Sequence, residues 1–150
     1  DGSFAPWEKL GAGIRSFAYG HGQDAVCGKE LTGIGFRGLK GVYALPEGIT
    51  AIGRGVFSGC AAEAVVFPSG LVSIGPDAFR TSSIRSAVFP QSLCDIGECA
   101  FRGSLLRTAV FPDHPVQIGR WCFSDTPLAS AFVPDRTLAD DGAFSGSPVF

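Results

Sequence analysis

A period of 22 residues runs through most of the chain and constrains its fold more than any other feature. Within each period a proline, an Ile-Gly pair and a phenylalanine recur in the same order. The prolines are Pro46, Pro68, Pro90, Pro112 and Pro134, the pairs begin at Ile52, Ile74, Ile96 and Ile118, and the phenylalanines are Phe57, Phe79, Phe101 and Phe123. A coil of this length cannot bury its own apolar face, so successive coils must stack and turn each recurring position into a ladder. The sequence therefore predicts a solenoid.

The residues before each proline predict one strand per coil. They are rich in β-branched and aromatic types, and each strand ends at a proline, which has no N–H to donate to a ladder. Because side chains alternate along a strand, the residue just before each proline and the residue two places earlier would both point into the core. The predicted strands are 64–67, 86–89, 108–111 and 130–133.

Two other recurring positions have their own structural consequences. The phenylalanine of each period would stack on its copy in the next coil, which gives an aromatic spine opposite the sheet. The glycine after each isoleucine would support either an unusual backbone torsion angle or the close approach of a neighbouring coil.

The pattern Pro-x-x-Leu-x-x-Ile-Gly-x-x-Ala-Phe-x-x-Cys, followed by a strand, resembles the BspA-like class of leucine-rich repeats. The resemblance implies a leucine-rich-repeat solenoid with a parallel β-sheet on one face and turns with short helical or 3-10 segments on the other. Two copies depart from the pattern. Pro115 takes the leucine position of the fourth copy, and Asp140 and Asp141 replace the Ile-Gly pair of the fifth.

The repeats divide the 150-residue chain into two parts. Residues 45–150 carry four full 22-residue copies and a truncated fifth. Residues 1–44 are predicted to form an atypical N-terminal capping segment with a degenerate first repeat, since the end of a solenoid exposes its core.

Composition and charge exclude several classes of protein. Apolar residues make up 45% and charged residues 17% of the chain, which is too apolar for a disordered segment. A net charge of −2, with the basic residues spread among acidic ones, argues against a nucleic-acid partner. No run of 18 apolar residues is present, so we expect no transmembrane segment in this chain.

None of the residues that could carry chemistry is predicted to be catalytic, cofactor-binding or metal-binding. The histidines, His21 and His114, are far apart, and a zinc site needs three or four convergent ligands. The adjacent carboxylates Asp140 and Asp141 are better explained by a loop than by an acid–base pair. We therefore expect a protein that is not an enzyme and holds no cofactor.

The five cysteines form an odd set without a CxxC pair, which leaves their disulfide pairing open. Small buried thiols are the simpler interpretation. Cys122 falls at a core position, whereas Cys99 is expected near the surface. The set is Cys27, Cys60, Cys94, Cys99 and Cys122.

One column of apolar residues is predicted to point outward from the sheet. The alternation that places Phe67 inside places its neighbour Val66 outside, and the same holds in each later coil. The alternative is that β-branched residues merely suit a strand, or that the alternation is shifted. A continuous exposed apolar stripe is typical of an interaction site. The candidate partner-binding residues are Val66, Val88, Val110 and Phe132.

These observations predict a non-enzymatic protein–protein interaction module. The family resemblance implies a surface or adhesion type, with an extracellular or cell-surface location. An alternative is a structural or accessory subunit docked in a larger assembly, and a remote alternative is a parallel β-helix enzyme acting on polysaccharides. The sequence leaves the partner, the compartment and the oligomeric state open.

Overall fold

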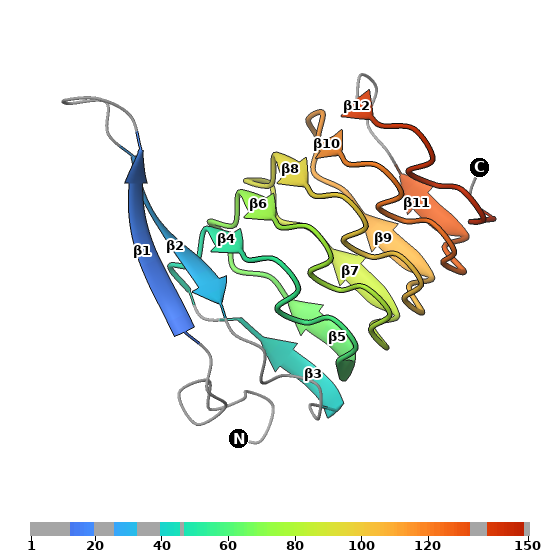
Figure 1. Ribbon diagram of the computed structural model, residues 1–150, viewed down its shortest axis with the longest axis horizontal. Coiled ribbons are helices and arrows are strands. Elements are labelled where there is room, and N and C mark those ends of the chain that lie inside the picture. The colour runs from blue at the N-terminus through green and yellow to red at the C-terminus, as the bar shows by residue number, and fades with distance from the viewer. Residues whose placement is uncertain (1–12, 20–25, 33–39, 46, 133–137, 149–150) are drawn as a thin grey trace.

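The computed structural model describes residues 13–19, 26–32, 40–45, 47–132 and 138–148, and for residues 13–19, 26–32, Lys40 and Phe132 it describes the backbone alone. The described chain winds into stacked coils that carry two largely parallel sheets, as Figure 1 shows. The predicted leucine-rich-repeat solenoid is therefore confirmed.

The five-stranded sheet contains the strands that the sequence predicted before each proline. Its neighbours are all parallel, and Ser86 pairs with Thr108 and Val88 with Val110, which is a step of one period. A bulge between Gly41 and Val42 shifts the register of the first pair. In the order of the sheet the strands are β11 (Ser130–Phe132), β9 (Thr108–Val110), β7 (Ser86–Val88), β5 (Ala61–Val66) and β3 (Lys40–Ala44).

A seven-stranded sheet forms a second face, which the sequence interpretation did not anticipate. Most of its strands are two residues long and include the recurring isoleucine, and they pair in parallel from coil to coil. These short strands are β4 (Ala51–Ile52), β6 (Ser73–Ile74), β8 (Asp95–Ile96), β10 (Gln117–Ile118) and β12 (Leu138–Ala139). The last of them pairs with β10 through Ile118 and Ala139, and Asp140 N donates to Ile118 O as Gly119 N donates to Ile96 O. The prediction that Asp140 and Asp141 replace the Ile-Gly pair was therefore wrong by one residue, because the shorter fifth copy places Ala139 and Asp140 there.

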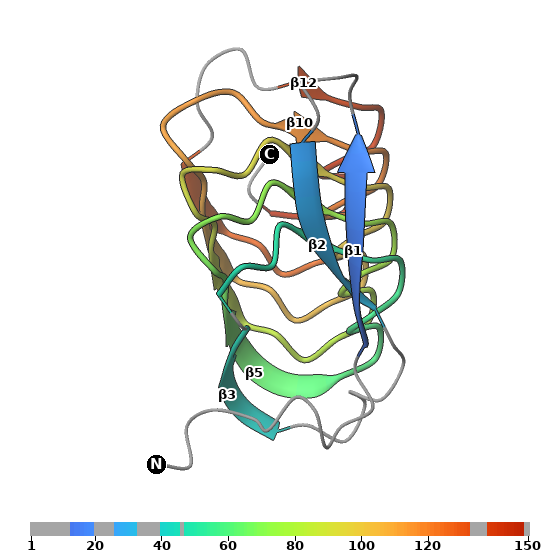
Figure 2. The same cartoon turned by 90° about the vertical axis from the view of Figure 1, so that its left-hand side faces the viewer.

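An antiparallel hairpin completes the seven-stranded sheet at its N-terminal edge. It consists of β1 (Gly13–Tyr19) and β2 (Val26–Thr32), and β2 pairs in parallel with β4. Figure 2 shows both strands in front of the stacked coils, at the end where the solenoid begins. The hairpin thus occupies the edge that the first short strand would otherwise expose.

Turns, not helices, follow each short strand, so the expected helical or 3-10 segments are not found in the described part of the chain. The backbone explains why. Asp77 and Thr81 have positive φ angles of 57° and 56°, and such residues interrupt a right-handed helix. The N–H of Phe79 donates to Ala100 O of the next coil at 2.6 Å. The N–H groups of the turn segments donate to carbonyl oxygens of the neighbouring coil. In an α-helix each of them would instead donate to the carbonyl four residues earlier in the same segment.

The predicted aromatic spine fills the interior. Consecutive rings lie 4.9, 5.0, 5.3 and 5.4 Å apart between centroids, with interplanar angles of 9°, 3°, 7° and 11°. A second column from the five-stranded sheet meets the spine edge-on, as for Phe67 and Phe79 at 5.8 Å and 84°. The first four spine residues are fully buried. The spine consists of Phe57, Phe79, Phe101, Phe123 and Phe144.

The glycine after each isoleucine permits close approach of the coils. A Cβ added at Gly97 would lie 2.6 Å from Pro76 N, and one at Gly119 would lie 2.6 Å from Glu98 N. Neither glycine has a positive φ angle. Of the two roles considered for this position, the structure therefore shows the close approach.

Candidate interaction surface

The outward column of the five-stranded sheet is exposed, as the alternation predicted. Val66, Val88 and Val110 expose 55%, 66% and 53% of their surface, while the intervening Ala87 and Ala109 are buried. A shifted alternation would have buried the valines instead. The backbone of Phe132 pairs with Val110, but the side chain of Phe132 lies outside the described residues.

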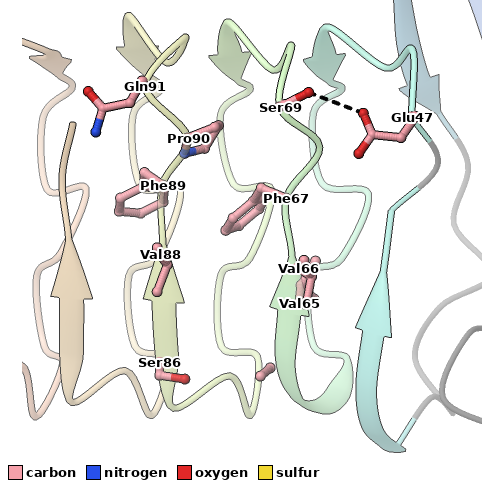
Figure 3. A pocket seen from close by; sticks show the side chains of 11 residues that line it. Glu47, Val65, Val66, Phe67, Ser69, Ser86, Val88, Phe89, Pro90 and Gln91 are labelled. Atoms are coloured by element: carbon pink, nitrogen blue, oxygen red, sulfur yellow. Dashed lines mark hydrogen bonds between the residues drawn. The ribbon is translucent and has the colours of Figure 1, made fainter.

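A hollow of about 650 Å³ lies between β5 and β7 over this column. Its exposed apolar side chains are those of Val66 and Val88, and the residues after them, Phe67 and Phe89, also line it although their rings are buried, as Figure 3 shows. At one rim Ser69 Oγ donates a hydrogen bond to Glu47 at 3.3 Å. The hollow therefore joins an apolar floor to a polar rim, a combination common at protein interaction sites.

Charged residues of opposite sign flank the valines. Three residues before each of two valines stands an exposed arginine, Arg85 before Val88 and Arg107 before Val110. Three residues after Val110 stands the exposed Asp113. Arg85 and Arg107 lie side by side in neighbouring coils, because Arg107 N donates to Arg85 O at 2.8 Å. On one side the valine column therefore has two arginines with Glu63 in the preceding coil, and on the other side it has an acidic residue.

The cysteines that the structure describes with side chains are free thiols, namely Cys60, Cys94, Cys99 and Cys122, while Cys27 lies outside that set. Cys122 is fully buried, as predicted, and burial raises its pKa well above the usual value. The expectation of a surface position for Cys99 was wrong, because only 6% of it is exposed. Its neighbours in adjacent coils, Asp77 and Trp121, are larger, and all three residues line a second, smaller hollow on the turn face.

The residues weighed for chemistry do not converge. Within the described ranges, no group of three or more His, Cys, Asp or Glu side chains could hold a metal ion. His114 lies with Nε2 2.6 Å from Gln91 O and Nδ1 3.0 Å from Pro115 O, which ties two coils together. Asp140 and Asp141 are exposed, and His21 lies outside the described residues. None of the residues that the structure describes forms a helix long and apolar enough to cross a membrane.

One charged cluster was missed by the sequence interpretation, which treated the arginines as scattered. Arg80 and Arg102 are one period apart and occupy the same place in neighbouring coils. The guanidinium of Arg102 also lies 5.5 Å from the ring centroid of Trp121. The 22-residue spacing of these arginines was the signal that could have found the cluster.

Comparison with known proteins gives one family. A family model for the BspA type leucine rich repeat region matches residues 41–149 in 6 copies. Neither the curated proteins nor the solved structures gave a significant match.

Proposed function

The chain belongs to the BspA-type leucine-rich repeat family, and on that premise we propose that it is a non-enzymatic module that binds a protein partner through its five-stranded sheet. Solenoids present long rigid surfaces whose exposed columns carry function. The family match over 41–149 supports an interaction module in preference to a polysaccharide-active enzyme.

The exposed valine column is the observation that carries this proposal. Val66, Val88 and Val110 lie on adjacent strands, and their aligned exposure gives a continuous apolar strip with charged flanks. Single exposed apolar residues are ordinary on protein surfaces, whereas a contiguous patch marks an interaction site. Phe132 would extend the strip by one coil if its side chain follows the same alternation.

The type of partner follows from the family and not from the geometry. The BspA-like resemblance supports a surface or adhesion role for the parent protein, with the valine column meeting a protein outside the cell. A structural subunit within a larger assembly would use the same strip. The strip is therefore compatible with both the surface role and the subunit role. We place the surface role first because the family is typically associated with cell surfaces.

Site-specific photocrosslinking tests the proposal. A photoreactive phenylalanine analogue is placed at Val88, and at Gln117 as the control, because Gln117 is exposed on the seven-stranded sheet. Each variant is then irradiated with intact cells and with lysate of the source organism. We expect adducts of one discrete mass from position 88 and none from position 117. Equal adducts from both positions, or none from position 88, would contradict the proposal.

Irradiation in the two preparations also separates the two roles. A partner on intact cells supports the surface role. A partner that is captured only from lysate, and that co-purifies in fixed stoichiometry, supports the subunit role.

A further inference from the structure

A cluster of arginines surrounds Trp121 on the turn face, away from the five-stranded sheet. The turns of neighbouring coils are in register, since Gly59 N donates to Arg80 O and Thr81 N to Arg102 O, both at 2.8 Å. Arg80 and Arg102 therefore stand one above the other. Four of the arginines in residues 41–148 gather here, and they are Arg54, Arg80, Arg102 and Arg120.

Trp121 occupies a backbone conformation that bulky residues rarely adopt. Its φ angle is 54°, and the equivalent residues of the other coils, which are Gly55, Asp77, Cys99 and Gly142, also have positive φ angles. A Cβ at Gly142 would lie 2.5 Å from the indole Cδ1, so the ring occupies the space that this glycine leaves. Yet 39% of Trp121 remains exposed. Among the residues at this position Trp121 therefore has the largest side chain, and it keeps part of an aromatic ring on the surface where a ligand can contact it.

Two guanidiniums are held against this ring. Arg102 lies 5.5 Å and Arg120 5.4 Å from its centroid, within the range of cation–π attraction. The contact fixes the orientation of two long side chains, which reduces the conformational entropy that they would lose on binding a ligand. Trp and Arg are also the residue types most enriched at the centres of protein interfaces.

A hollow of about 270 Å³ lies beside the ring. Cys99 is small and lies in the coil between those of Asp77 and Trp121, so the larger side chains stand higher on either side of it. Arg80 and Arg102 line the same hollow. It is therefore wide enough for a small polar group, and Arg54 is a third arginine in its lining.

The ion pairs within the cluster are weak and leave most donors unused. Arg54 and Arg80 share Asp77 at 3.8 and 3.4 Å, and Arg102 contacts Asp125 at 3.5 Å. Each is a single long contact between partly exposed groups, whereas a guanidinium offers five N–H donors in a fork that fits a carboxylate. Among the described residues Arg120 forms no ion pair, although it contacts the ring of Trp121.

We propose that the hollow between Arg80, Arg102 and Trp121 binds the carboxylate of an acidic peptide segment. The arginines slightly outnumber the acidic groups Asp77, Glu98 and Asp125, in a chain whose overall net charge is −2. An isolated carboxylate matches such a small positive excess. A densely charged polyanion would be repelled by Asp77 and Glu98, which line the same hollow.

Titration with a fluorescent, C-terminally amidated peptide that carries a single glutamate among neutral residues, at low ionic strength, tests this site. The variant R80Q/R102Q removes two of the three guanidiniums that line the hollow. The variant R85Q/R107Q is the matched control, because it changes the net charge equally and its arginines are also one period apart, but lie beside the five-stranded sheet. We expect at least tenfold weaker binding for R80Q/R102Q and less than twofold for R85Q/R107Q. The peptide should also shift the indole N–H resonance of Trp121, assigned with W121F.

Three outcomes would overturn the proposal. They are an equal loss in both double variants, an unchanged Trp121 resonance, and binding of heparin through Arg80 and Arg102 without binding of the single-glutamate peptide. The valine column itself is tested by crosslinking at Val88, an experiment that changes none of these arginines. The two ideas can therefore fail separately.

Discussion

The ring of Phe101 lies 5.0 Å from that of Phe79, with 3° between their planes. The other face of Phe101 meets Phe123 at 5.3 Å, and its edge meets Phe89 at 5.7 Å. The ring contacts of one aromatic side chain thus connect three coils, and the stability of the stack depends on these contacts.

Replacement of Phe101 by alanine removes the central ring of the spine. Phe101 is fully buried, so the substitution opens a cavity between two coils. We expect a loss of about 3–5 kcal/mol in the free energy of unfolding, measured by urea denaturation. Phe101→Leu, which keeps most of the volume, should lose clearly less. A loss below about 1 kcal/mol for the alanine variant would show that the spine does not support the stack.

Replacement of Gly97 by alanine tests the close approach of the coils. The new Cβ would lie 2.6 Å from Pro76 N and 2.8 Å from the carbonyl carbon of Gly75, both of them backbone atoms. We expect a destabilisation of about 1–3 kcal/mol by thermal denaturation. Gly70→Ala is the control, because a Cβ there meets nothing within 4 Å. That control should be neutral or stabilising by up to about 1 kcal/mol, and equal effects at both sites would refute the explanation.

Replacement of Val88 and Val110 by serine tests whether the valine column lies on the surface or in the core. Both side chains are exposed, so each substitution should change the free energy of unfolding by no more than about 0.5 kcal/mol. The partner crosslinked at position 88 of the original chain should bind the double variant more weakly in a pull-down assay. Val116→Ser introduces the same change at a buried site and should lose about 2 kcal/mol. Cooperative unfolding of the double variant would show that the column belongs to the core.

The thiols should separate by burial in a titration with a disulfide reagent. Cys94 is exposed and should react in the native protein at pH 8, whereas Cys60 and Cys122 should react only after denaturation. Burial raises the pKa of both buried thiols, so each remains protonated in the folded chain when it would begin to ionise in the unfolded one. Stability should therefore fall as pH rises above about 9. Cys122→Ala should reduce that fall, and a flat profile in the original chain would contradict the assignment.

Much of the fold could be predicted because the repeat places equivalent residues in the same environment many times. A single Phe would not specify a spine, whereas Phe79, Phe101 and Phe123 at equal spacing do. The strands before each proline and the outward direction of Val88 followed from the same reasoning. The exposed site was therefore predictable as a surface, while its partner was not, because an apolar strip carries little information about what covers it.

The short strands and the turns could not be predicted in the same way. A two-residue strand such as Asp95–Ile96 carries no alternation, and it is defined by its pairing with the next coil. The left-handed residue is Asp77, Cys99 or Trp121 in successive coils, so no single residue type marks the turn. This variation also hid the burial of Cys99 and the cluster around Trp121. The division of the chain at residue 44 stays a prediction.

The bonds from each turn to its neighbour also determine how the molecule can change in length. Every coil offers the same donors on one side and the same acceptors on the other, as when Phe57 N donates to Ala78 O and Phe79 N to Ala100 O. A whole coil can therefore be inserted or removed between two others without altering either junction. The molecule is in this sense modular, and its length is adjustable in increments of about 4.8 Å.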